Sequence, residues 1–129
     1  YATTIETSQD NIINKSELVQ RFVDASIEGW YSYIFDDPKL ANELIKQDNR
    51  EMTDDLLDYA RKEIKKRGIV YSGDAELLGI GSMTEKRWKS FYEMMKDQGL
   101  YSQNLDYSKA FTLKFVNNDK WIGFEKKYQ

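Results

Sequence analysis

Apolar residues recur at three- and four-residue intervals in four stretches of the chain, and this period predicts four principal helices. Asn14 lies three residues before Glu17, which predicts a start for the first and longest helix that resembles a capping box. Gly29 falls inside this helix at a cost of about 1 kcal/mol relative to alanine, so either a close crossing or a neutral accident accounts for it. The apolar face expected for the first helix consists of Leu18, Phe22, Val23, Ile27, Trp30, Tyr31 and Ile34.

Capping residues mark the other three helices. Asp37 followed by Pro38 is typical of a helix start, because aspartate caps the end and proline at the first position loses no useful N–H. Thr53 is expected to cap the third helix, and Gly68 to close it in a left-handed conformation. Thr84 is expected to begin the fourth helix. The buried face expected for the fourth helix consists of Trp88, Phe91, Tyr92 and Met95.

Short segments rich in β-branched and aromatic residues predict two or three short strands. They are residues 1–7 (YATTIET), 69–71 (IVY) and 111–116 (FTLKFV). The expected fold class of the isolated chain is therefore mainly α, with four principal helices and two or three short strands.

The chain divides into a main part, residues 1–117, and a turn-rich charged tail, residues 118–129. Trp121 belongs to this tail, where it either contacts another chain or contacts nothing. Trp30 and Trp88 lie on apolar helix faces and are expected in the core. The glycine-rich loop at 79–82 lacks the lysine and the glycine spacing of a phosphate loop, so we expect a turn that leads into a helix cap.

Composition narrows the classes of function. At 129 residues the chain fits one domain. Its net charge is −3 with acidic and basic residues interleaved, so no concentrated basic face is available for nucleic acid. The basic run at 65–67 falls at a predicted helix C-terminus, where cations complement the helix dipole. No apolar run approaches the roughly 20 residues that a membrane span needs, so no membrane span is expected.

The chain contains neither cysteine nor histidine. Disulfides, thiolate nucleophiles, Cys/His zinc sites and imidazole bases are therefore excluded within it. The carboxylate pairs Asp36/Asp37 and Asp54/Asp55 lie at predicted helix starts, where capping and the dipole explain them, and Asp74 is expected to organise a turn. We expect no catalytic residue, no metal site and no cofactor, and so no enzyme.

The stretch 69–88, IVYSGDAELLGIGSMTEKRW, carries a resemblance together with the opening YATTIETSQDNIINKSELVQRFVDASIEGWYSYI. MTEKRWKSFYEMMKDQGLY and NLDYSKAFTLKFVN extend it to about residue 117. The sequence resembles the ABC-transporter solute-binding proteins of the nitrate/sulfonate/bicarbonate and thiamine-pyrimidine-precursor class. The resemblance implies the C-terminal helical part of an α/β type II periplasmic-binding-protein fold. The first lobe, with most of the ligand pocket, has no counterpart here.

The resemblance also implies a function. It implies capture of a small polar solute by lobe closure and delivery to an ABC permease, without chemistry. Such a protein would be a bacterial periplasmic protein or extracellular lipoprotein. By resemblance, the opening segment runs near the interlobe cleft, so Tyr1, Thr3 and Thr4 are the candidate ligand-binding residues. The family also includes fungal pyrimidine-synthesis enzymes, but their histidine-dependent chemistry finds no histidine here. The ligand itself stays open.

Loss of a covering sheet would leave an apolar patch exposed on the helices. We expect a second copy of the chain, or an associated first-lobe fragment, to cover that patch. We also expect Tyr1 to mark a processed, proteolysed or engineered start. The alternative is a free-standing helical interaction module, whose exposed aromatic and methionine face binds a partner protein.

Overall fold

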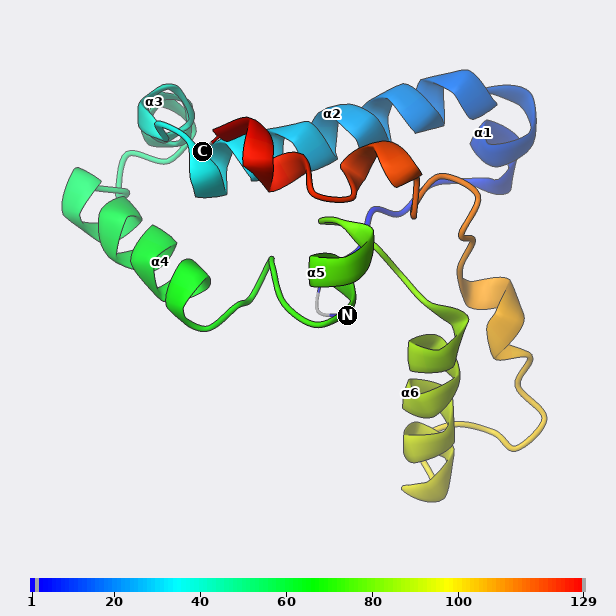
Figure 1. The fold of residues 1–129 in the computed structure, drawn as a ribbon. Helices are drawn as coiled ribbons and strands as arrows, with labels where there is room; N and C mark the ends of the chain where they lie inside the picture. Colours follow the sequence, from blue (N-terminus) through cyan, green and yellow to red (C-terminus); the bar gives the residue numbers. More distant parts are fainter. Residues whose placement is uncertain (2, 129) are drawn as a thin grey trace.

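The computed structural model describes residue 1 and residues 3–128, and this part of the chain is mainly helical, as predicted (Figure 1). Its α-helices are α1 (Gln9–Asn14), α2 (Ser16–Phe35), α3 (Lys39–Asp48), α4 (Asp54–Lys66), α5 (Asp74–Leu78) and α6 (Glu85–Asp97). Three 3₁₀ helices follow: η1 (Tyr107–Ala110), η2 (Asp119–Trp121) and η3 (Phe124–Tyr128).

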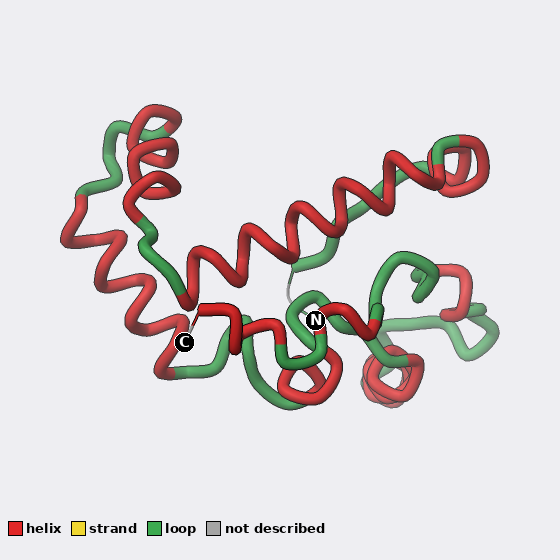
Figure 2. Tube along the Cα trace, turned by 45° about the horizontal axis from the view of Figure 1, so that its top comes forward, coloured by secondary structure: helices red, strands yellow, loops and turns green. Residues whose placement is uncertain are grey.

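The prediction of two or three short strands is wrong. Figure 2 shows only helices and loops, and no strand occurs in residue 1 or residues 3–128. Strand propensity measures how a side chain fits a pleated, half-buried surface, so it needs a neighbouring strand to take effect. Here the segments at 69–71 and 111–116 pack against helices, and Val70 and Phe115 contribute side chains to the core.

The predicted helix ends at Thr53, Gly68 and Thr84 are confirmed, whereas the helix expected to have Pro38 at its first position begins at Lys39. Thr53 Oγ1 accepts a hydrogen bond from the Leu56 N–H at 3.2 Å, at the start of α4. Gly68 has φ +60°, and the Ile69 N–H donates to the Ile64 carbonyl at 3.0 Å, which closes α4. Capping chemistry therefore fixed these boundaries locally.

Two short helices were not predicted. α1 precedes α2, and Ser8 Oγ caps it by accepting a hydrogen bond from the Asn11 N–H at 3.2 Å. The long helix consequently begins at Ser16 and not at Asn14. The segment 74–78, expected as loop, forms α5.

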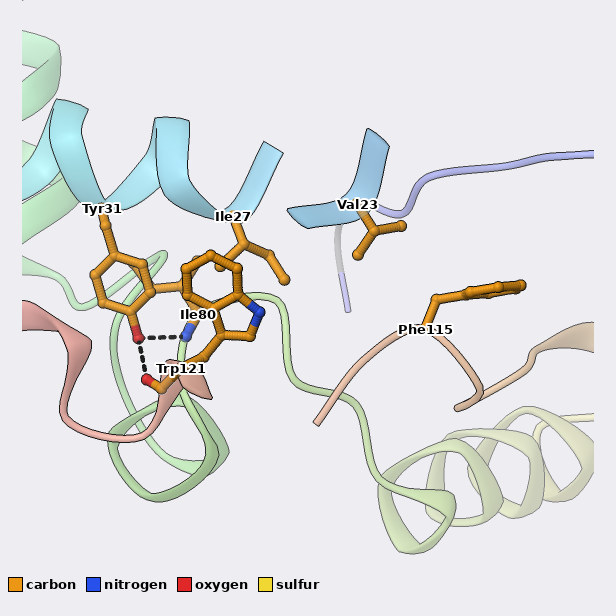
Figure 3. Close-up of a cluster of buried hydrophobic side chains, with 6 residues drawn as sticks. All are labelled: Val23, Ile27, Tyr31, Ile80, Phe115 and Trp121. Atoms are coloured by element: carbon orange, nitrogen blue, oxygen red, sulfur yellow. Dashed lines mark hydrogen bonds between the residues drawn. The ribbon is translucent and has the colours of Figure 1, made fainter. Parts of the chain in front are cut away.

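The core lies under the inner face of α2, where Val23, Ile27 and Tyr31 are buried (Figure 3). The Tyr31 hydroxyl donates a hydrogen bond to the Trp121 carbonyl at 2.9 Å and accepts one from the Ile80 N–H at 3.0 Å. One side chain of α2 thus joins the glycine-rich loop to the C-terminal segment.

Trp121 lies in this core, with 4% of its surface exposed, and not in a free tail. Its ring lies 6.1 Å from that of Tyr31 and 4.8 Å from that of Phe124, between ring centroids. In Figure 1 the segment that contains η2 and η3 follows α2, and η3 packs on that helix. A Cβ on Gly79 would lie 2.7 Å from Trp121 Cβ, so glycine at 79 allows this close approach.

The molecule is open. Its accessible surface is 9616 Å², whereas a compact monomer of 15.2 kDa exposes about 7,100 Å². In Figure 1, α4 and α6 extend away from α2 in different directions. The described part accordingly exposes 18 large apolar side chains.

The apolar face predicted for the first helix divides into two. Its inner half is buried, at Val23, Ile27, Tyr31 and Ile34. Its outer members are exposed: Leu18 by 54%, Phe22 by 61% and Trp30 by 43%. The prediction that Trp30 belongs to the core is therefore wrong, since 43% of its surface is exposed.

Candidate functional site

Polar and aromatic side chains meet where the start of the chain reaches the first turns of α5 and α6. We call Tyr1, Asp74, Thr84, Arg87 and Trp88 the Tyr1 cluster. The Thr84 N–H donates to the Tyr1 hydroxyl oxygen at 2.7 Å, and the Thr84 hydroxyl donates to Asp74 Oδ2 at 3.2 Å. The Tyr1 hydroxyl donates to the same carboxylate oxygen at 3.5 Å.

Local helix chemistry places most of these side chains. Thr84 is the N-cap of α6, and its hydroxyl oxygen accepts a hydrogen bond from the Arg87 N–H at 3.4 Å. Asp74 is the first residue of α5 and follows Gly73, whose φ is +58°. Because the N-termini of α5 and α6 lie close together, the hydroxyl of Thr84 and the carboxylate of Asp74 face each other.

Aromatic contacts complete the Tyr1 cluster. The Arg87 guanidinium carbon lies 4.4 Å from the centre of the Tyr1 ring, in cation–π geometry. The Tyr1 and Trp88 rings lie 5.5 Å apart between centroids, and Trp88 stacks on Phe111 at 5.0 Å with 4° between the planes. Trp88, predicted as core, is half-buried within this aromatic stack.

The Tyr1 cluster offers binding groups at the surface. Tyr1 and Arg87 are exposed, while Asp74, Thr84 and Trp88 are half-buried. Arg87 presents a planar fork of N–H donors, Asp74 and the hydroxyls accept hydrogen bonds, and the rings offer flat apolar faces. This combination suits a small planar or anionic solute. The cluster forms an open surface and does not enclose a ligand.

The structure brings only one of the three predicted ligand-binding residues into this cluster. Tyr1 is at its centre. Thr3 and Thr4 are exposed, and neither side chain hydrogen-bonds to another residue of the described part. Sequence reasoning missed Asp74 and Thr84 as partners of Tyr1, because they lie 73 and 83 residues away along the chain. No local spacing could have indicated them.

The glycine-rich loop at 79–82 faces the core. The Ile80 N–H is occupied by the Tyr31 hydroxyl, and a Cβ on Gly81 would lie 2.9 Å from Ile27 Cγ1. A loop that cradles a phosphate needs free, outward N–H groups. The loop therefore acts as a packed turn ahead of α6, as the sequence predicts.

A small apolar cavity lies elsewhere, between α2 and α4. It measures about 90 Å³, and Phe35, Ile64, Val70 and Tyr71 are among its lining residues. Ligand pockets usually measure about 300–1,000 Å³, so this cavity is too small to hold a solute. At its edge, burial raises the pKa of the Tyr71 phenol to about 12, and the charge of Glu125 contributes to the same shift.

No group of three or more acidic side chains in the described part is arranged to hold a metal ion. Among the described helices, none combines the length and the apolar character that a bilayer crossing requires. Comparison of the chain with protein-family models, with curated proteins and with solved structures gives no match.

Proposed function

We propose that the chain is the C-terminal part of a solute-binding protein that serves an ABC importer, and that it captures a small polar solute without chemistry. The Tyr1 cluster is the observation that carries this proposal. It joins a carboxylate, two hydroxyls, a guanidinium and two aromatic rings at an exposed position. Such groups hold and orient a ligand.

The large exposed surface supports the inference that the chain is only part of a larger protein. The chain exposes about 2,500 Å² more than a compact monomer of its mass. That excess is comparable to the area buried in large, permanent interfaces. A second lobe packed on these helices would cover it and would supply the other wall of a solute site beside the Tyr1 cluster.

A thermal-shift screen of the protein expressed from its natural gene tests the proposal. The probes are nitrate, bicarbonate, ethanesulfonate and 4-amino-5-hydroxymethyl-2-methylpyrimidine, which represent the solute classes that the resemblance implies. A ligand present at 100 times its Kd stabilises a protein by about 2.7 kcal/mol, which raises the melting temperature by several degrees. Absence of any shift with all four solutes at millimolar concentration would sink the proposal.

The alternative, a free-standing helical interaction module, is favoured by one observation. The outer side of α2 exposes Leu18 and Phe22, and a helix of another protein could bind there. The intact mass of the natural protein separates the two functions. A mass well above 15.2 kDa supports the transport proposal, whereas a mass of 15.2 kDa supports the module.

A further inference from the structure

The outer face of α2 carries a regular stripe that the chain itself does not use. Leu18, Phe22, Ala25 and Gly29 follow one another at intervals of four, three and four residues, so they share one side of the helix. All four are exposed. The residues of α2 that are buried in the core, Val23, Ile27 and Tyr31, lie on the opposite side of the helix. We call these four residues the outer α2 stripe.

No packing contact within the described part of the chain requires glycine at position 29. A Cβ built on it meets no atom within 4 Å, and its φ is not in the left-handed region. A glycine at mid-helix costs about 1 kcal/mol relative to alanine. The close crossing that the sequence allowed is therefore absent within the chain, and Gly29 leaves a flat, open position beside Ala25.

We propose that the outer α2 stripe is the interface of a homodimer in which two α2 helices pack antiparallel, on surface that the second lobe of the proposed function leaves free. In one register, Leu18 lies over Gly29 of the second copy and Phe22 over Ala25 of the second copy. Each large side chain then fills the space above a small one. Two-fold symmetry repeats both contacts, as a self-complementary interface requires.

The same register also matches charges. Arg21 and Glu28 lie seven residues apart along one flank of the stripe, at positions that flank the seam of a helix pair. Antiparallel packing with Leu18 over Gly29 places Arg21 opposite Glu28 of the second copy, and symmetry makes two such pairs. Arg21 is exposed, and the Glu28 side chain is 55% exposed with Lys127 Nζ at 3.3 Å. These exposed charges set the register more than they add affinity.

Surface shape and area support a second copy as the occupant. A shallow depression of about 450 Å³, lined by Ile13, Leu18 and Arg21 among others, lies where the end of the opposing helix would rest. The monomer has about 2,500 Å² of surface beyond that of a compact chain, so the dimer would cover only part of this excess. A single helix pair buries less than about 1,200 Å², which is the size of weak and transient interfaces, so we expect a weak dimer.

Sedimentation velocity between 1 and 200 µM protein tests the dimer. The wild-type chain is expected to shift from 15.2 kDa to twice that mass across this range. Gly29→Gln is expected to weaken dimerisation at least tenfold, because its side chain occupies the space that Leu18 of the second copy needs. It should not unfold the monomer, since glutamine favours helix and the position is open. Ser90→Gln, on the exposed side of α6, is the matched control and should leave the dimer unchanged.

A charge exchange tests the register. Arg21→Glu and Glu28→Arg should each weaken self-association, because each places like charges opposite one another twice. An equimolar mixture of the two variants should form a heterodimer by native mass spectrometry, because both pairs are then of opposite charge. Arg50→Glu is the control for a change of net charge away from the stripe.

Two results would overturn the proposal. One is a wild-type chain that stays monomeric at 200 µM. The other is a dimer that neither Gly29→Gln nor the charge exchange affects, because such a dimer uses another surface. A second protein bound at this stripe in place of the second copy would give the first result.

Discussion

At the scale of single residues, the burial of Tyr31 can be predicted from the sequence, but its hydrogen-bond partners cannot. Its place in an apolar period predicts burial, and the structure confirms it, with 0% of its surface exposed. The two hydrogen bonds of its hydroxyl, to Trp121 and Ile80, span 90 and 49 residues. Those partners depend on how the chain closes in space, so no local pattern indicates them.

Removal of this hydroxyl should destabilise the fold. Tyr31→Phe keeps the ring but leaves the Ile80 N–H without its buried acceptor, which costs about 1–3 kcal/mol. Urea unfolding followed by circular dichroism measures the change. Tyr59→Phe is the matched control, because Tyr59 is 62% exposed. Equal stability of the two variants would show that the Tyr31 hydroxyl contributes nothing.

Tyr71 should make stability depend on alkaline pH. Burial raises the pKa of its phenol to about 12 from 10.0, and Glu125 adds to the shift. The folded state therefore keeps a proton that the unfolded chain releases, so the stabilisation is complete below pH 10 and is lost as pH rises toward 12. Between pH 9.5 and 11.5 the free energy of unfolding should fall less steeply for Tyr71→Phe than for the wild type. Identical slopes would contradict this assignment.

At the scale of elements, helices were predicted well where both period and capping residues specify them. Thr53, Gly68 and Thr84 mark helix ends through contacts within four residues, and such contacts can be read from sequence. The prediction of two or three short strands was wrong, because strand pairing requires a neighbouring strand that the described part does not provide. The C-terminal segment was expected as a tail, because it is turn-rich and charged.

The C-terminal segment is expected to stabilise the fold mainly through the buried side chain of Trp121. Trp121→Ala should cost about 3–5 kcal/mol, the usual loss for a buried tryptophan. Domains are stable by only about 5–15 kcal/mol, and only nine apolar residues are buried in the described part. We therefore expect the variant to lose most of its cooperative thermal unfolding.

Trp30→Ala is the matched control for this variant. Trp30 is 43% exposed and lies on α2, so its loss should cost much less than that of Trp121. Comparable melting temperatures for the two variants would show that the segment 118–128 does not stabilise the fold and is a tail.

At the scale of the whole molecule, the apolar period identifies residues that are candidates for burial. It does not show which of them another element covers. Leu18 and Val23 belong to the same predicted face, yet one is 54% exposed and the other 7%. The Tyr1 cluster has the same origin, because its members come from the start of the chain and from two later helices. Tyr1 was predicted by resemblance alone, and its partners became visible only in three dimensions.

We propose that the Tyr1 cluster binds a small polar solute. Isothermal titration of the natural protein with the four probe solutes tests it most directly, in the wild type and in Arg87→Gln. We predict binding of one solute, and a Kd at least tenfold weaker in Arg87→Gln, because a hydrogen bond to a charged group contributes about 1.5–3 kcal/mol. Arg50→Gln, at an exposed position away from the cluster, should bind like the wild type. No binding of any probe, or an unchanged Kd in Arg87→Gln, would contradict the account.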